Sequence, residues 1–250
     1  MDSGGIQLSG ADITSLMSWW SDAGVDVLID ESPRNWLTPV ERPAAAPPPP
    51  PVETKVADTQ QPLSAPAPSF PDTLDAFRTW LVTSEKLSLP LASRIPPVGD
   101  PASGLMMLVD MPDAADVEAG QLLTGEAGLL FDRMIAAMGR DRASLYLSAM
   151  APGRPGGGYV DRAAAVLFGE LARHHVGLVR PRALLLMGEA PSRTFLNMGF
   201  VEARGRVHEV PLPGGAVPAI ATFHPRTLLQ HPAQKKRAWD DLQMLMKLIA

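Results

Sequence analysis

Three carboxylates lie close together in the middle of the chain. Asp110, Asp113 and Asp116 follow directly after the apolar residues 105–109. Clustered carboxylates suit a general base, a group that positions a water molecule, or a site for a hard metal ion. An ordinary Asp-rich turn is the alternative, because Asp side chains also hydrogen-bond to nearby backbone in turns. This segment is the first candidate for a catalytic site.

His224 is the second candidate, because it ends the apolar run 219–223 and precedes Pro225. A proline restricts the backbone of the residue before it, so the imidazole is expected to be held at a strand end, aimed into the site. His208 is expected on a basic surface loop. Helix ends or the surface are expected for His174, His175 and His231. No histidine pair has metal-ligand spacing, so no metal is expected.

Glycines and basic residues offer further possible contacts to phosphate. The helix start at residues 125–128 presents free backbone N–H groups to an anion, and it suits a plain turn and cap equally well. Residues 156–158 are three glycines without a nucleotide-binding fingerprint, so a flexible loop is expected. A rim that tracks phosphates, or alternatively a solvated charged face, is expected from Arg204, Arg206, Arg226, Lys235, Lys236 and Arg237.

Composition excludes several classes of protein. The chain has no cysteine, which excludes disulfides, thiolate zinc sites, iron–sulfur clusters and a cysteine nucleophile. The net charge of −5 excludes a wholly basic nucleic-acid coat, although residues 1–71 hold 3 basic and 9 acidic side chains and residues 72–250 hold 19 and 18. No apolar stretch reaches the roughly 18 to 20 residues of a membrane span, and the N-terminus has no signal-peptide pattern. A cytoplasmic protein without membrane contact is expected.

The first 71 residues differ in character from the rest. Residues 12–24 place apolar side chains at helical spacing between a possible N-cap and a glycine, which predicts a short amphipathic helix within an N-terminal segment 1–38. Such a short helix needs a surface to pack on, either on the main domain or on a protein partner. Residues 39–71 contain 11 of the 26 prolines and predict a disordered, extended linker.

From residue 72 the pattern predicts an α/β domain, because short apolar runs alternate with helical periodicities. Strands are expected at residues 105–109, 145–150, 183–187 and 217–223, and helices at 72–85, 126–138, 161–176, 190–197 and 232–249. Four parallel strands with right-handed crossovers would form a three-layer α/β/α sandwich. Ligands of such sheets bind beyond the carboxyl ends of the strands, where the polar residues above are found.

An ordered set of motifs over residues 72–250 resembles the uracil-DNA glycosylase superfamily, and specifically its bacterial iron–sulfur family, family 4. The matching segments are Gly125-Glu126-Ala127-Gly128-Leu129-Leu130-Phe131-Asp132-Arg133-Met134, Tyr146-Leu147 with Arg154-Pro155, Arg180 to Gly188, Arg204-Gly205-Arg206-Val207-His208, and Ala221 to Leu229 with Lys236 to Leu242. The resemblance implies hydrolysis of the N-glycosidic bond of a damaged base that is flipped out of DNA.

The resemblance also implies roles for individual residues. Catalytic positions are matched by Asp110, Asp116 and His224, and base-binding positions by Met111, Pro112, Leu123 and Ala149. Gly125 and Arg154 would join the basic rim as DNA contacts. The sequence departs from the family at both base-reading positions, where Leu123 replaces a stacking Phe and Ala149 replaces an Asn, and Val109 and Asp113 replace glycines.

Gly153 stands at a cluster cysteine of the family. Without a cluster, no cofactor is expected, and apolar packing is expected to hold that part of the domain instead. Three functions remain open at this stage. They are a glycosylase of altered base specificity, a non-enzymatic DNA-binding scaffold that recruits a partner through residues 12–24, and a different chemistry in the same cleft, such as capture of an abasic sugar by His208.

Overall fold

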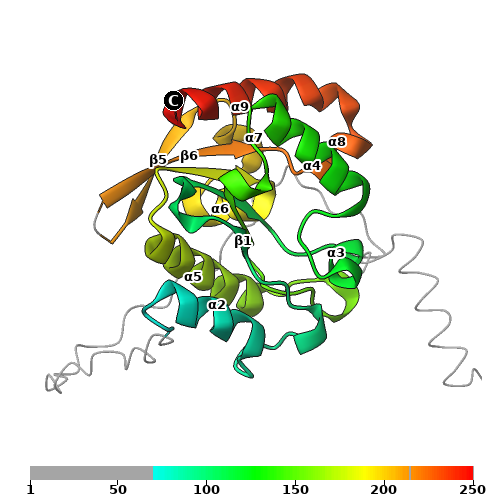
Figure 1. Cartoon of the computed structure of the whole chain (residues 1–250), viewed down its shortest axis with the longest axis vertical. Coiled ribbons are helices and arrows are strands. Elements are labelled where there is room, and N and C mark those ends of the chain that lie inside the picture. Colours follow the sequence, from blue (N-terminus) through cyan, green and yellow to red (C-terminus); the bar gives the residue numbers. More distant parts are fainter. Residues whose placement is uncertain (1–69, 214, 250) are drawn as a thin grey trace, which may run out of the picture. The chain divides into compact units, whose positions relative to one another are not determined.

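The computed structural model describes residues 70–213 and 215–249, which fold around one six-stranded sheet (Figure 1). The strand order is β1-β3-β2-β4-β6-β5. The strands are β1 (Val98–Gly99), β2 (Leu105–Val109), β3 (Tyr146–Ala149), β4 (Ala183–Met187), β5 (Val207–Leu212) and β6 (Gly215–Thr222). The inner four are parallel, and β1 and β5 are antiparallel edge strands. The α/β class is confirmed.

The prediction of a four-stranded sheet was wrong, because both edge strands were missed. Strand β1 has two residues, too few for any periodicity. Strand β5 is mostly exposed, with Val210 as its one buried residue, and so lacks the apolar run of a central strand. His208 therefore lies in β5 rather than in a loop, with its Nε2 2.7 Å from the carbonyl oxygen of Ala203.

The long helices match the predicted ones closely. They are α2 (Leu74–Thr83), α4 (Gly125–Ala137), α5 (Arg162–Val179), α6 (Glu189–Leu196) and α9 (Lys235–Ile249). Three short helices were not predicted, namely α3 (Ala114–Ala119), α7 (Phe200–Ala203) and α8 (Pro225–Gln230). One or two turns carry too few positions for a periodic signal, so they were read as connections between elements.

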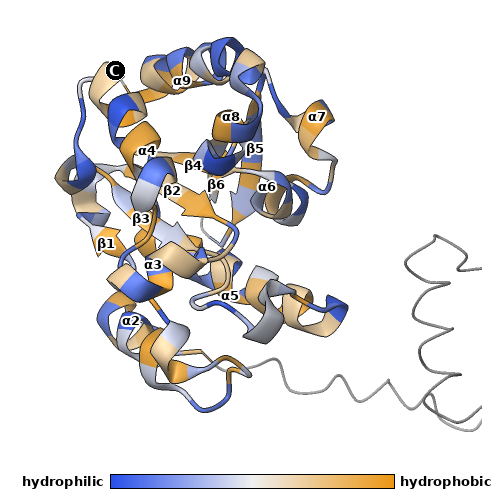
Figure 2. Ribbon diagram, turned by 90° about the vertical axis from the view of Figure 1, so that its right-hand side faces the viewer, coloured by the Kyte–Doolittle hydropathy of each residue, from blue (hydrophilic) through white to orange (hydrophobic). Residues whose placement is uncertain are grey.

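Helices cover both faces of the sheet, which gives the expected three layers (Figure 1). Along β2, Leu105, Met107 and Val109 pack toward α4 and α9, whereas Met106 and Leu108 pack toward α5. Every residue of β2, β3 and β4 is buried. The centre of the sheet is accordingly apolar in colour (Figure 2), as expected for parallel strands buried on two sides.

A buried arginine organises the segment before the sheet. Arg94 is 9% exposed, and its two terminal guanidinium nitrogens donate to four backbone carbonyl oxygens at 2.7–3.5 Å, those of Leu81, Ser84, Leu87 and Leu89. Apolar side chains of the same segment pack against α2 and α5. Apolar packing was expected to hold this segment. The hydrogen bonds of the guanidinium hold it as well, and the periodicity of the sequence does not predict them.

His175 was expected at a helix end, but it is buried in the core. Its Nε2 lies 3.0 Å from the hydroxyl of Tyr146, and its Nδ1 lies 3.3 Å from the hydroxyl of Ser148. Burial lowers the pKa of His175 to about 3, and the positive charges of Arg78 and His174 act in the same direction. The imidazole is therefore neutral in the folded protein at neutral pH.

The helix predicted over residues 12–24 lies outside the described residues, as does the predicted linker except for its last two residues. Phe70 packs edge-on against Phe77 and Trp80, and the Pro71 carbonyl oxygen lies 2.8 Å from Nε2 of His174. Phe70 and Pro71 thus both contact the α/β domain. Within residues 70–213 and 215–249, no helix combines the length and apolar character needed to cross a membrane.

We expect Arg94→Met to lower the free energy of unfolding by about 3 kcal/mol or more, because several buried carbonyls lose their donor at roughly 1–3 kcal/mol each. Arg94→Lys should recover part of the loss, since the ammonium still has three donors. Urea denaturation measures both variants. Arg162→Met, at an exposed position, serves as the control and should change stability by less than about 0.5 kcal/mol. Equal stabilities for Arg94→Met and Arg162→Met would contradict this role.

The buried His175 predicts a loss of stability in acid. Below about pH 6.5 the unfolded chain takes up a proton that the folded chain does not bind until near pH 3. The free energy of unfolding should therefore fall as the pH is lowered, by up to about 1.4 kcal/mol per pH unit from this group. Denaturation at pH 7 and pH 5 should show a shallower pH dependence for His175→Phe, whereas the exposed His231→Gln should behave like wild type.

Candidate active site

Three loops meet at the carboxyl ends of the parallel strands, and ion pairs and hydrogen bonds join them. Arg226, in the first turn of α8, donates to Oδ2 of Asp110 at 3.2 Å and to Oδ1 of Asp113. From the loop after β3, Arg154 donates to the Pro112 carbonyl oxygen at 3.1 Å, and its guanidinium lies 3.9 Å from Asp113. The structure thus brings the predicted acidic loop together with two of the predicted basic residues.

One carboxylate oxygen of Asp110 is in an ion pair, and the other has no hydrogen-bond partner among the described residues. Its Oδ2 faces Arg226, whereas its Oδ1 is buried and has no hydrogen-bond partner among the described residues. A buried acceptor without a donor is unfavourable by roughly 1–3 kcal/mol, so such a group is expected to bind water or a ligand. Asp110 also lines a cavity, which makes it the best placed acid of the site.

Asp116 is placed differently. Its side chain is 4% exposed, and it accepts hydrogen bonds from the backbone N–H of Asp113 and from both the N–H and the hydroxyl of Thr124, at 2.7–3.0 Å. These bonds cap α3 and fasten it to the start of α4. All of its described contacts are internal, and the catalytic role implied for Asp116 stays a prediction.

His224 caps α8 from the end of β6. Its Nδ1 accepts a hydrogen bond from the backbone N–H of Arg226 at 3.1 Å, so the neutral ring carries its proton on Nε2. The side chain is 4% exposed. Burial lowers the pKa of His224, and the carboxylate of Asp110 opposes that shift. The imidazole of His224 is therefore neutral at neutral pH and is able to donate from Nε2.

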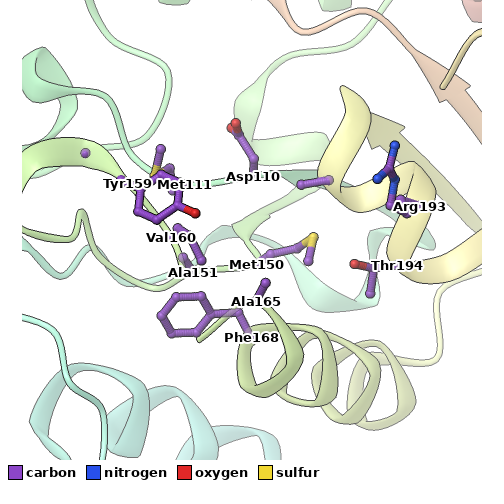
Figure 3. A pocket seen from close by; sticks show the side chains of 12 residues that line it. Asp110, Met111, Met150, Ala151, Tyr159, Val160, Ala165, Phe168, Arg193 and Thr194 are labelled. Carbon is purple, nitrogen blue, oxygen red and sulfur yellow. The ribbon is translucent and has the colours of Figure 1, made fainter. Parts of the chain in front are cut away.

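A cavity of about 430 Å³ opens beside Asp110 on the α5 and α6 side of the sheet (Figure 3). In Figure 3, Tyr159 and Met111 line one end and Arg193 and Thr194 of α6 line the opposite end. The remaining lining residues are Met150, Ala151, Gly158, Val160, Ala165, Phe168 and Ala190. Apart from Met111, the apolar part of this lining was not predicted from the sequence, because its members come from separate elements and share no motif.

The remaining base-binding positions lie away from this cavity. Leu123 and Ala149 belong to the core cluster shared with α4 and α9, on the other side of the sheet from Met150. Leu123 is 2% exposed, and its carbonyl oxygen accepts from the guanidinium of Arg142 at 2.6 Å. Pro112 is buried within the loop that Arg154 holds. Leu123 and Ala149, the two positions that depart from the family, are thus part of the apolar core.

The predicted basic rim divides into two groups. Arg204 is committed to the interior, where its guanidinium pairs with the fully buried Asp241 at 2.6 Å and lies 4.3 Å from the ring centre of Phe223. Its neighbour Arg206 is exposed. Three exposed cations begin α9, namely Lys235, Lys236 and Arg237. Gly125 is exposed at the first residue of α4 with a φ of 60°, a conformation that favours glycine.

The iron–sulfur cluster implied by the resemblance does not fit this chain. There is no cysteine to ligate iron. At Gly153, a Cβ atom would lie 2.9 Å from Cγ of Arg94 and 3.0 Å from the hydroxyl of Ser93, so no side chain has room there. Among the described residues, no group of three or more His, Asp or Glu side chains is arranged to hold a metal ion.

Comparison with known proteins identifies the family. The sequence model of the Uracil DNA glycosylase superfamily matches residues 96–243. The type-4 uracil-DNA glycosylase of Pyrobaculum aerophilum is 23% identical over 157 residues, covering 60% of this chain and 80% of that protein. The type-4 enzyme of Archaeoglobus fulgidus is 23% identical over 161 residues, covering 62% and 81%. The resemblance drawn from the motifs is confirmed, and the chain belongs to the uracil DNA glycosylase superfamily.

Proposed function

We propose that this protein is a DNA glycosylase, which hydrolyses the N-glycosidic bond of a damaged base flipped out of DNA and so begins base excision repair. One observation carries the proposal. The unpartnered, buried oxygen of Asp110 lies at a ligand-sized cavity, and Arg226, whose backbone N–H is capped by His224, pairs with the other oxygen of the same carboxylate. The superfamily membership and the type-4 relatives support the same reaction class.

The reaction follows from the charges that develop. As the bond between C1′ and the base nitrogen breaks, its electron pair leaves with the base, and the sugar becomes cationic. The carboxylate of Asp110 stabilises this cation and accepts a hydrogen bond at Oδ1 from the attacking water. The water oxygen bonds to C1′, and the proton that it loses is balanced by protonation of the departing base. Nε2–H of His224 is the donor for a base carbonyl that gains negative charge.

A second function is favoured by one specific observation. Arg226 pairs with Asp110 and Asp113 together, so a cation lies beside the carboxylate that must stabilise a cationic sugar. A permanent ion pair between Arg226 and these carboxylates would suit a DNA-binding protein that has lost glycosylase activity and recruits a partner through residues 12–24. The following experiment separates the two functions.

We expect purified protein to release at least one damaged base from oligonucleotides that carry uracil, hypoxanthine or xanthine, seen as strand cleavage after alkali. Asp110→Asn and His224→Ala should each lower the rate by about 100-fold or more, because each removes a group that acts on developing charge. Asp240→Asn, at an exposed position on α9, is the matched control and should retain activity. No cleavage by excess wild-type protein that still binds DNA would establish the second function.

DNA affinity should depend steeply on salt, because phosphate contacts release condensed counterions. Replacing Lys235, Lys236 and Arg237 together by alanine should reduce the slope of log affinity against log salt by about 2 to 3, roughly one for each cation lost. Fluorescence anisotropy with a labelled duplex and single strand measures the slope. Lys247→Ala, in the last turn of the same helix, should leave it unchanged. An equal slope in the triple variant and in wild type would remove α9 from the DNA interface.

A further inference from the structure

The base-reading positions of the family do not face the cavity in this chain. Leu123 and Ala149 are core residues on the α4 and α9 side of the sheet. The cavity opens on the other side, where the side chains of Asp110 and Met150 lie. A base held near Asp110 therefore needs different contacts from those implied by the sequence.

Tyr159 is the aromatic residue best placed to supply such contacts. It lines the cavity and is 76% exposed, more than any other Phe, Tyr or Trp residue among the described residues. Large apolar surface left in solvent beside a cavity is typical of a binding site. In Figure 3, its ring stands at one end of the cavity near Met111, with Phe168 on the α5 side.

The loop that carries Tyr159 is built to hold its position. Gly157 and Gly158 have φ values of 78° and 71°, which disfavour other residues. A Cβ atom at Gly158 would lie 2.6 Å from a guanidinium nitrogen of Arg154, so the loop packs directly on that side chain. Arg154 in turn donates to Pro112 in the acidic loop. Tyr159 thus directly follows a glycine that packs on Arg154, and Arg154 in turn contacts the loop that begins with Asp110.

We propose that Tyr159 stacks on the flipped base and that the α5–α6 cavity favours a bicyclic, purine-type base over a single-ring base, an inference that rests on the proposed glycosylase function. The cavity volume of about 430 Å³ lies in the range that encloses small-molecule ligands, so it has room for a bicyclic base, which buries more apolar area against the lining than a single ring does. Its lining is mostly alanine, methionine, valine and aromatic carbon. Binding to such a surface is stabilised mainly by the apolar area that the base buries, and less by hydrogen bonds to its polar edges.

Binding to uncleavable DNA tests this inference apart from turnover. The probes are oligonucleotides with a 2′-fluoroarabino sugar, which resists hydrolysis, bearing hypoxanthine, uracil or a normal base. Wild-type protein should bind the hypoxanthine probe more tightly than the uracil probe. Tyr159→Ala should weaken the hypoxanthine complex by roughly 5- to 100-fold, the range measured for loss of base stacking, whereas Tyr159→Phe should retain it.

A pair of neighbouring variants on α5 tests the cavity itself. Ala165 lines the cavity, so Ala165→Trp should fill it and remove the preference for hypoxanthine. Val166 is 59% exposed and does not line it, so Val166→Trp should bind as wild type does. Thermal unfolding of each variant controls for misfolding.

The outcomes separate the two proposals. Tighter binding of hypoxanthine that depends on Tyr159 and Ala165, without cleavage of ordinary substrates, would support the cavity and overturn the glycosylase function. Cleavage of uracil that is insensitive to Tyr159→Ala and Ala165→Trp would support the function and overturn the cavity. Equal binding of all three probes by wild-type protein would also overturn the cavity.

Discussion

The constraint on which the site depends is the burial of four parallel strands on both faces. Successive side chains of such strands alternate between two helix layers, and an unpaired polar group is unfavourable in either layer. Val109 and Ala149 therefore belong to the α4 and α9 core, whereas Asp110 and Met150, one residue later, border the cavity under α5 and α6. A single step along each strand separates core residues from residues that line the cavity.

Ion pairs then hold together loops that leave different strands. Arg226 bridges two carboxylates of the loop after β2, and Arg154 fastens the same loop to the glycine-rich turn that carries Tyr159. These guanidinium groups are partly exposed, so each pair alone contributes little stability. Their effect is geometric, because a planar fork with several donors fixes the orientation of the groups it binds. The arrangement leaves one buried oxygen of Asp110 without a hydrogen-bond partner among the described residues.

The region that carries a metal cluster in the resembled family is held here by a different interaction. Arg94 draws four carbonyl oxygens of one chain segment around a buried guanidinium, and Gly153 packs against its side chain. Arg94 thereby fixes an irregular segment that has no secondary structure to satisfy its backbone. A guanidinium does so without cysteine, iron or dependence on the redox state, although desolvation of the charge lowers the pKa of Arg94.

The sequence by itself determined the apolar runs of the inner strands, the long helices and the order of motifs that identifies the family. Those signals are local, since periodicity and capping act within one element. The edge strands and short helices were missed because they contain too few buried residues to show a period. Only the tertiary structure decided that Arg226 would reach Asp110 across 116 positions, that His175 would be buried, and which face of the sheet would hold a cavity. Those outcomes depend on which elements pack together, and the spacing of residues along the chain does not predict this packing.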